Sequence, residues 1–128
     1  MLIADDEREF ARTLAEMVRH GGHEVVAVVH TGLDAIRAYR RHKPQVVLMD
    51  FKMGGLNGLT ACRNILSEDP KGRVLFLSGL SEYRDLAPEW SGAFAVLQKP
   101  ISYGMLEQFL QEAEAREPAP AEVVEAAN

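Results

Sequence analysis

Charged side chains follow three of the short apolar runs in this sequence. Asp5 and Asp6 come directly after the first run, and Asp50 comes directly after the third. Lys99 follows the last run and precedes Pro100. Because the carboxyl ends of parallel strands lie at one edge of an α/β sheet, we expect these charged side chains to converge on a single site.

The residue types at this expected site favour phosphate chemistry. Carboxylates crowded into one pocket repel one another unless a cation lies among them. We expect Mg²⁺, which takes hard oxygen ligands, since no histidine and cysteine set suggests a transition metal. Lys99 adds a mobile positive charge, and Ser78, which ends the fourth apolar run, adds a hydroxyl donor. A carboxylate nucleophile with these partners predicts phosphoryl transfer to an aspartate.

Apolar strand-like runs alternate along the chain with segments of helical periodicity. The runs cover residues 1–4, 24–29, 46–49, 73–77 and 93–98, and the helical segments cover residues 8–20, 33–41, 59–68, 82–90 and 103–115. Thr31, Ser81 and Ser102 are placed to cap three of the helices. This order predicts an α/β fold with a doubly wound, five-stranded parallel sheet and helices on both faces.

Composition limits the class of protein. The 128 residues suffice for one domain, and the net charge of −5 comes largely from residues 111–128. We expect a domain over residues 1–115, followed by a flexible acidic tail or truncated linker over residues 116–128. The absence of a clustered basic face argues against direct nucleic-acid binding. No run is long enough for membrane insertion. A single cysteine, Cys62, and an acidic N-terminal segment point to a reducing cytoplasm.

Taken together, the strand-end residues resemble the receiver domain of bacterial two-component response regulators, including the chemotaxis regulators, over residues 1 to about 115. The resemblance rests on the pair Asp5-Asp6, on Asp50, on Ser78-Gly79 and on Lys99-Pro100, all in the family's order and at familiar spacings. It implies a flavodoxin-like (βα)5 fold with the strand order 2-1-3-4-5. It also implies a phosphoprotein that acts in a phosphorelay.

The resemblance implies a role for each acidic residue. Asp50 would accept the phosphoryl group from a sensor histidine kinase or a histidine phosphotransfer protein. Asp6 and Asp50 would bind Mg²⁺ directly, and Asp5 would act through water. The backbone carbonyl of Lys52 would be a further magnesium ligand.

The remaining motif residues would act on the phosphoryl group itself. Lys99 would neutralise its charge, and Ser78 would donate a hydrogen bond to one of its oxygens. The Lys99–Pro100 peptide bond is cis in relatives. The chain departs from the family at Val96, where relatives usually carry an aromatic ring that moves on phosphorylation. Relatives commonly form homodimers through a face that includes this strand, and a homodimer is left open here.

Several functions compete for these residues. The first is a phosphoacceptor switch, whose catalysis is expected to be limited to its own phosphorylation and dephosphorylation. It would stand alone and bind a protein target, or belong to a longer protein with its own output domain. The alternative is a magnesium-dependent phosphatase or phosphotransferase with an aspartyl nucleophile. Such enzymes need a second carboxylate two residues after the nucleophile, where this chain has Lys52. The four histidines show no metal-ligand spacing, and we expect them at the surface or in turns.

Overall fold

The computed structural model describes residues 1–79 and 91–115. The strands are β1 (Leu2–Ala4), β2 (Ala27–Val29), β3 (Val47–Asp50), β4 (Val74–Ser78) and β5 (Ala95–Gln98), and the helices are α1 (Arg8–His20), α2 (Gly32–His42), α3 (Gly58–Glu68) and α6 (Tyr103–Ala115). The helix predicted over residues 82–90, its cap Ser81 and the tail from residue 116 lie outside the described residues. None of the helices in the described ranges has the length and apolar character that crossing a membrane requires.

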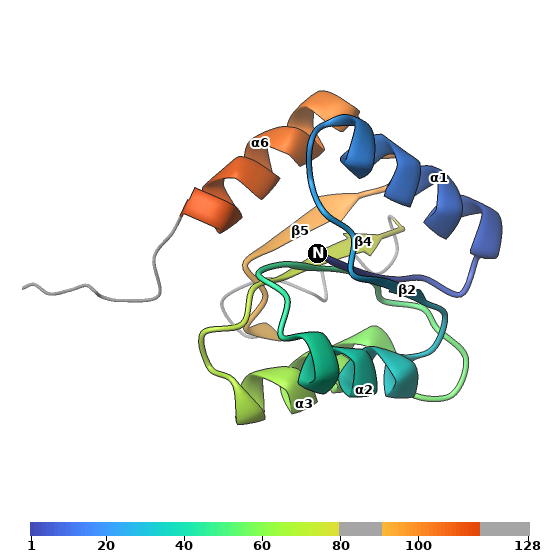
Figure 1. Cartoon of the computed structure of the whole chain (residues 1–128). Helices are drawn as coiled ribbons and strands as arrows, with labels where there is room; N and C mark the ends of the chain where they lie inside the picture. The colour runs from blue at the N-terminus through green and yellow to red at the C-terminus, as the bar shows by residue number, and fades with distance from the viewer. Residues whose placement is uncertain (80–90, 116–128) are drawn as a thin grey trace, which may run out of the picture.

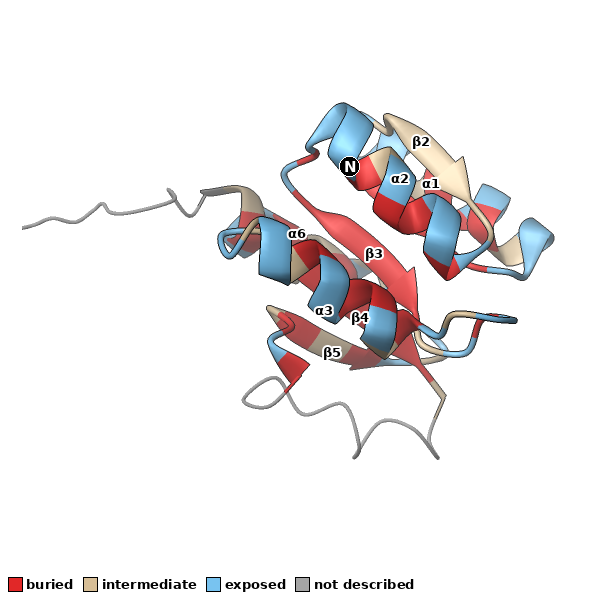
Figure 2. Ribbon diagram, turned by 90° about the horizontal axis from the view of Figure 1, so that it is seen from below, coloured by how far each residue is buried: buried red, intermediate tan, exposed pale blue. Residues whose placement is uncertain are grey.

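All five strands run parallel in the order β2-β1-β3-β4-β5, which confirms the predicted topology. α1 and α6 cover one face of the sheet, and α2 and α3 cover the other (Figure 1). Parallel strands with helices on both faces must be apolar along their whole length. The central strands are indeed buried throughout, as Figure 2 shows for β3 and β4.

Successive residues of each strand enter two separate cores. Ile3, Leu48 and Leu75 belong to the core beneath α1 and α6. Their neighbours Leu2 and Met49 belong to the core beneath α2 and α3. Full burial of a side chain of this size stabilises the fold by about 2 kcal/mol. The two cores therefore fix the position of every strand end along the sheet edge.

Helix caps agree with the sequence where they are described. The Thr31 hydroxyl oxygen accepts a hydrogen bond from the Asp34 N–H at 3.0 Å, as predicted for the start of α2. The Asn57 side chain accepts one from the Thr60 N–H at 2.9 Å and begins α3. Such caps satisfy backbone donors that the helix itself leaves unpaired.

β2 is shorter than the predicted run over residues 24–29. It is one of the two edge strands, and its three residues are only half-buried, as the tan arrow in Figure 2 shows. The Glu24 carbonyl accepts a hydrogen bond from the amino terminus at 2.8 Å, and the Val26 N–H donates to the Met1 carbonyl at 2.8 Å. These two hydrogen bonds pair backbone groups of the segment before β2, although that segment is not part of the strand.

His23 makes side-chain contacts that the sequence analysis did not predict. Its ring nitrogens lie 2.8 Å from Glu107 Oε1 and 3.1 Å from Glu114 Oε2, both on α6, and its side chain is 8% exposed. Burial favours the neutral ring, but the hydrogen bonds and charges of Glu107 and Glu114 raise the pKa of His23 overall. In its protonated form the ring donates to both carboxylates, and these contacts link α6 to the segment after α1.

Gly58 allows α3 to begin against the end of β3. Its N–H donates to the Phe51 carbonyl at 2.8 Å. A Cβ at this position would lie 2.9 Å from Phe51 Cα and would clash with the backbone oxygen of Asp50. The absence of a side chain at Gly58 is therefore a condition for the observed position of Asp50.

We predict that Gly58→Ala lowers the free energy of unfolding by about 2 kcal/mol, because the backbone at the end of β3 must move. Gly54→Ala is the matched control, since a Cβ at Gly54 meets nothing within 4 Å. Urea unfolding of both variants measures the difference. Equal unfolding midpoints would show that the close approach at Gly58 is not required.

Candidate functional site

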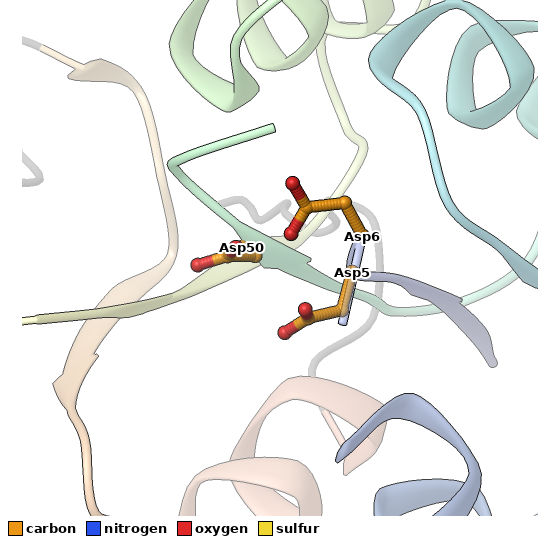
Figure 3. Close-up of side chains that lie close together, drawn as sticks. All are labelled: Asp5, Asp6 and Asp50. Atoms are coloured by element: carbon orange, nitrogen blue, oxygen red, sulfur yellow. The ribbon is translucent and has the colours of Figure 1, made fainter. Parts of the chain in front are cut away.

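Three carboxylates meet at the carboxyl edge of the sheet. Asp5 and Asp6 follow β1, and Asp50 is the last residue of β3. Each contributes an oxygen, and these oxygens lie within 4.8 Å of one another. Figure 3 shows the three carboxylates turned to the same side. Asp5 and Asp50 are buried, at 1% and 7% exposure, whereas Asp6 is exposed. The structure thus brings together the acidic residues that the sequence places at strand ends.

Lys99 lies between two of these carboxylates. Its Nζ is 3.2 Å from Asp5 Oδ2 and 3.3 Å from Asp50 Oδ1. The same nitrogen lies 4.4 Å from the centroid of the Phe10 ring, on α1. A cation over an aromatic face is attracted by the negative face of the ring. Lys99 is therefore held by two charges and one ring, and it partly compensates the crowded acidic groups.

Lys99 directly follows the last residue of β5 and reaches the site from there. Its backbone N–H donates to the Ser78 carbonyl at 2.8 Å, which joins the ends of β4 and β5. The Lys99–Pro100 peptide bond is cis, as the family resemblance implies.

Burial and charge oppose each other at Asp50. Burial and the negative charge of Asp5 raise the pKa of Asp50 to about 6, although the nearby Lys99 ammonium group lowers it. At Lys99, burial favours the neutral amine, but the charges of Asp5 and Asp50 raise its pKa overall. Asp50 is therefore a carboxylate whose ionisation costs free energy in the folded chain.

The other two predicted site residues occupy different positions. Ser78 is buried at the end of β4, one residue beyond Leu77, which pairs with Asp50. Its hydroxyl donates to the Gly79 carbonyl at 3.1 Å. Lys52 is exposed and lies two residues beyond β3. Ser78 thus lies at the end of the strand next to Asp50. Rotation of its side chain could redirect its hydroxyl from the Gly79 carbonyl to a bound ligand.

His30 is a residue near this site to which sequence reasoning gave no role. It directly follows β2, and its Nδ1 lies 2.8 Å from the backbone oxygen of Asp5. The signal was present in the sequence, because His30 follows a strand-like run just as Asp5 and Asp50 do. Strand-end position alone would have placed it at the correct edge.

The arrangement fits a hard divalent cation and a phosphoryl group. Carboxylate oxygens are the ligands that Mg²⁺ prefers, and the three donors already face one another. A buried carboxylate, an ammonium group 3.3 Å away and a hydroxyl at the end of the neighbouring strand are groups that could serve phosphoryl transfer to an aspartate.

We predict that Asp50→Asn stabilises the metal-free fold at neutral pH by about 2 kcal/mol, because it removes the cost of ionising Asp50. The folded pKa lies above the ordinary value of 3.8, so the contribution of Asp50 to stability is complete below that value and is lost as the pH rises through about 6. The stabilisation should therefore vanish in acid.

Urea unfolding in EDTA at neutral and acid pH measures this effect. Asp34→Asn is the control, since the Asp34 side chain is 53% exposed and lies on α2, away from the cluster. A loss of stability in Asp50→Asn at neutral pH would contradict the cost assigned to the charged carboxylate.

The comparisons with known proteins all point to the same family. Residues 1–111 match the family model of the response regulator receiver domain. The transcriptional regulatory protein PdtaR of Mycobacterium tuberculosis is 38% identical over 104 residues, which make up 80% of this chain and 50% of PdtaR. The chemotaxis protein CheY of Listeria monocytogenes is 32% identical over 82 residues, which make up 64% of this chain and 69% of CheY.

A solved structure agrees with these matches. The crystal structure of a response regulator receiver domain protein from Clostridium thermocellum superposes with a TM-score of 0.82 at 25% identity, covering 88% of this chain and 90% of that one. The chain spans about half the length of PdtaR.

Proposed function

Because this chain belongs to the response regulator receiver family, we propose that Asp50 is its phosphoacceptor in a two-component system. Receiver domains of this family accept a phosphoryl group on an aspartate and act as signalling switches. The observation that carries the assignment to Asp50 is its position as a buried carboxylate at the end of β3, 3.3 Å from Lys99 and beside Asp5 and Asp6.

In the transfer, a carboxylate oxygen of Asp50 forms a bond to phosphorus while the bond from phosphorus to the donor breaks. Lys99 favours the ionised form of Asp50, which is the nucleophile. The same Lys99 ammonium group then lies beside the new phosphoryl oxygens. The Ser78 hydroxyl turns away from the Gly79 carbonyl and donates to one of these oxygens.

Asp5, Asp6 and Asp50 are the residues that would hold Mg²⁺. Members of the family bind Mg²⁺ at an acidic cluster of this kind. Bound there, Mg²⁺ would neutralise negative charge on the phosphoryl group. Asp5 already contacts the Glu7 N–H at 2.9 Å and Lys99 at 3.2 Å, which supports its assignment as a ligand acting through water. The Lys52 backbone carbonyl completes the proposed set.

The family match favours signalling over the phosphatase or phosphotransferase alternative. Catalysis by this chain is proposed to extend only to its own phosphorylation and dephosphorylation. This limit is supported by the residue two positions after Asp50, which is Lys52 where such enzymes carry a second carboxylate as their acid and base.

The proposed donor is the phosphohistidine of a sensor histidine kinase or of a histidine phosphotransfer protein. The proposed receiver unit covers residues 1–115, and the segment that follows leads to a separate output domain or ends a stand-alone receiver. In either case the partner is a protein, and direct nucleic-acid binding by this unit is not part of the proposal. A reducing cytoplasm is the proposed compartment, in keeping with the free, buried thiol of Cys62.

We predict that acetyl phosphate with Mg²⁺ adds one phosphoryl group to the wild-type chain, because the site itself supplies the groups that promote transfer. Asp50→Asn should gain none, and Asp34→Asn should gain as much as the wild type. Intact-mass spectrometry measures all three. Equal phosphorylation of Asp50→Asn would overturn the assignment of the acceptor.

We predict that Mg²⁺ raises the free energy of unfolding of the wild type but not of Asp6→Asn, because a ligand stabilises the state that binds it. Asp6 is exposed, so its substitution should change stability in EDTA by less than about 0.5 kcal/mol. Urea unfolding with and without MgCl₂ measures both effects. An unaltered response of Asp6→Asn to Mg²⁺ would remove Asp6 from the ligand set.

A further inference from the structure

His30 makes a direct contact with the backbone of the acidic pair. It follows β2, the edge strand whose Val29 pairs with Ala4 of β1. Its Nδ1 lies 2.8 Å from the Asp5 backbone oxygen. A carbonyl oxygen only accepts hydrogen bonds, so the ring nitrogen must carry the proton and donate. The contact therefore fixes both the tautomer of His30 and the direction of the Asp5 carbonyl.

That carbonyl belongs to the peptide group that joins Asp5 to Asp6. A peptide group is planar, so fixing its oxygen also fixes the N–H and Cα of the next residue. On the other side of Asp5, its N–H donates to the Val29 carbonyl at 3.0 Å. The end of β2 thus holds both backbone groups of Asp5.

The Asp6 carboxylate depends on this backbone more than the Asp5 carboxylate does. Asp5 is buried, and its two oxygens contact the Glu7 N–H and Lys99 Nζ. Asp6 is exposed, and among residues 1–79 and 91–115 no hydrogen bond or ion pair holds its carboxylate. Its place within 4.8 Å of the other two carboxylates therefore follows from the direction of the Asp5–Asp6 peptide.

We propose that His30 is a positioning residue that orients the Asp5–Asp6 peptide and thereby preorganises Asp6 to bind a divalent cation with Asp50. The proposal rests on the proposed function, in which these carboxylates hold Mg²⁺. Ligands already in place lose less conformational freedom on binding, so preorganisation appears as tighter binding of the ion. It need not alter the rate of phosphoryl transfer once the ion is bound.

Two substitutions of similar size and shape distinguish the effect of the His30 hydrogen bond from the effect of its packing. In His30→Asn the amide nitrogen stands at the same number of bonds from Cα as Nδ1 and can donate to the Asp5 carbonyl. In His30→Leu a methyl group stands there and cannot donate. His30 is only half-buried, so neither change empties a core position.

The experiment measures the dissociation constant for Mg²⁺ alone by titration calorimetry. We expect His30→Leu to weaken binding about five- to tenfold, as the loss of one hydrogen bond implies, and His30→Asn to restore it to within about twofold. At saturating Mg²⁺, phosphorylation of Asp50 by acetyl phosphate should proceed at the same rate in all three proteins.

Wild-type affinity in His30→Leu would overturn the proposal, and so would equal weakening in both variants, which would assign the effect to the ring's shape. Failure of the wild type to bind Mg²⁺ would instead overturn the proposed function. Unfolding in EDTA checks that each variant is folded. If His30→Leu does not fold, His30→Ala replaces it, because alanine also removes the hydrogen-bond donor without introducing a larger apolar group.

Discussion

The burial of carboxylates at one sheet edge, and the repulsion among them, are the constraint on which the rest of this site depends. Three carboxylate oxygens lie within 4.8 Å of one another, and two of the three residues are buried. Charges so close in a partly dry site cost free energy unless cations offset them. Strand direction brings the carboxylates together, since all five strands are parallel and their carboxyl ends share one edge.

Lys99 and the two apolar cores offset this free-energy cost. The ammonium group bridges Asp5 and Asp50, while burial of the strands on both faces provides the free energy that keeps the strand ends aligned. Gly58 lets the chain turn closely behind Asp50, and His30 holds the backbone of Asp5 from the neighbouring strand. The resulting site is buried at Asp5 and Asp50 and exposed to solvent at Asp6.

Much of this could be predicted from the sequence because strand ends are visible as the ends of apolar runs. Position at a strand end was enough to select Asp5, Asp6, Asp50, Ser78 and Lys99. The sheet order came from the family resemblance, and the structure confirms it. Contacts between distant side chains were not visible. His23 contacts α6 residues that lie 84 and 91 positions away in the sequence, and no local pattern reveals these contacts. The position of His30 after a strand-like run indicates the correct sheet edge, but not its hydrogen bond to the Asp5 carbonyl, 25 positions away. The sequence also placed the start of β2 too early, at residue 24, whereas the strand begins at Ala27.

The most direct test of the account is a ¹³C NMR titration of the Asp50 carboxyl group, assigned by comparison with Asp50→Asn. Without divalent ions the midpoint should lie near 6, well above the ordinary value of 3.8, because burial and Asp5 oppose its ionisation. Saturating Mg²⁺ should lower it, since a bound cation favours the carboxylate. An ordinary midpoint without metal, unchanged by Mg²⁺, would contradict the claim that burial and repulsion among the carboxylates govern the site.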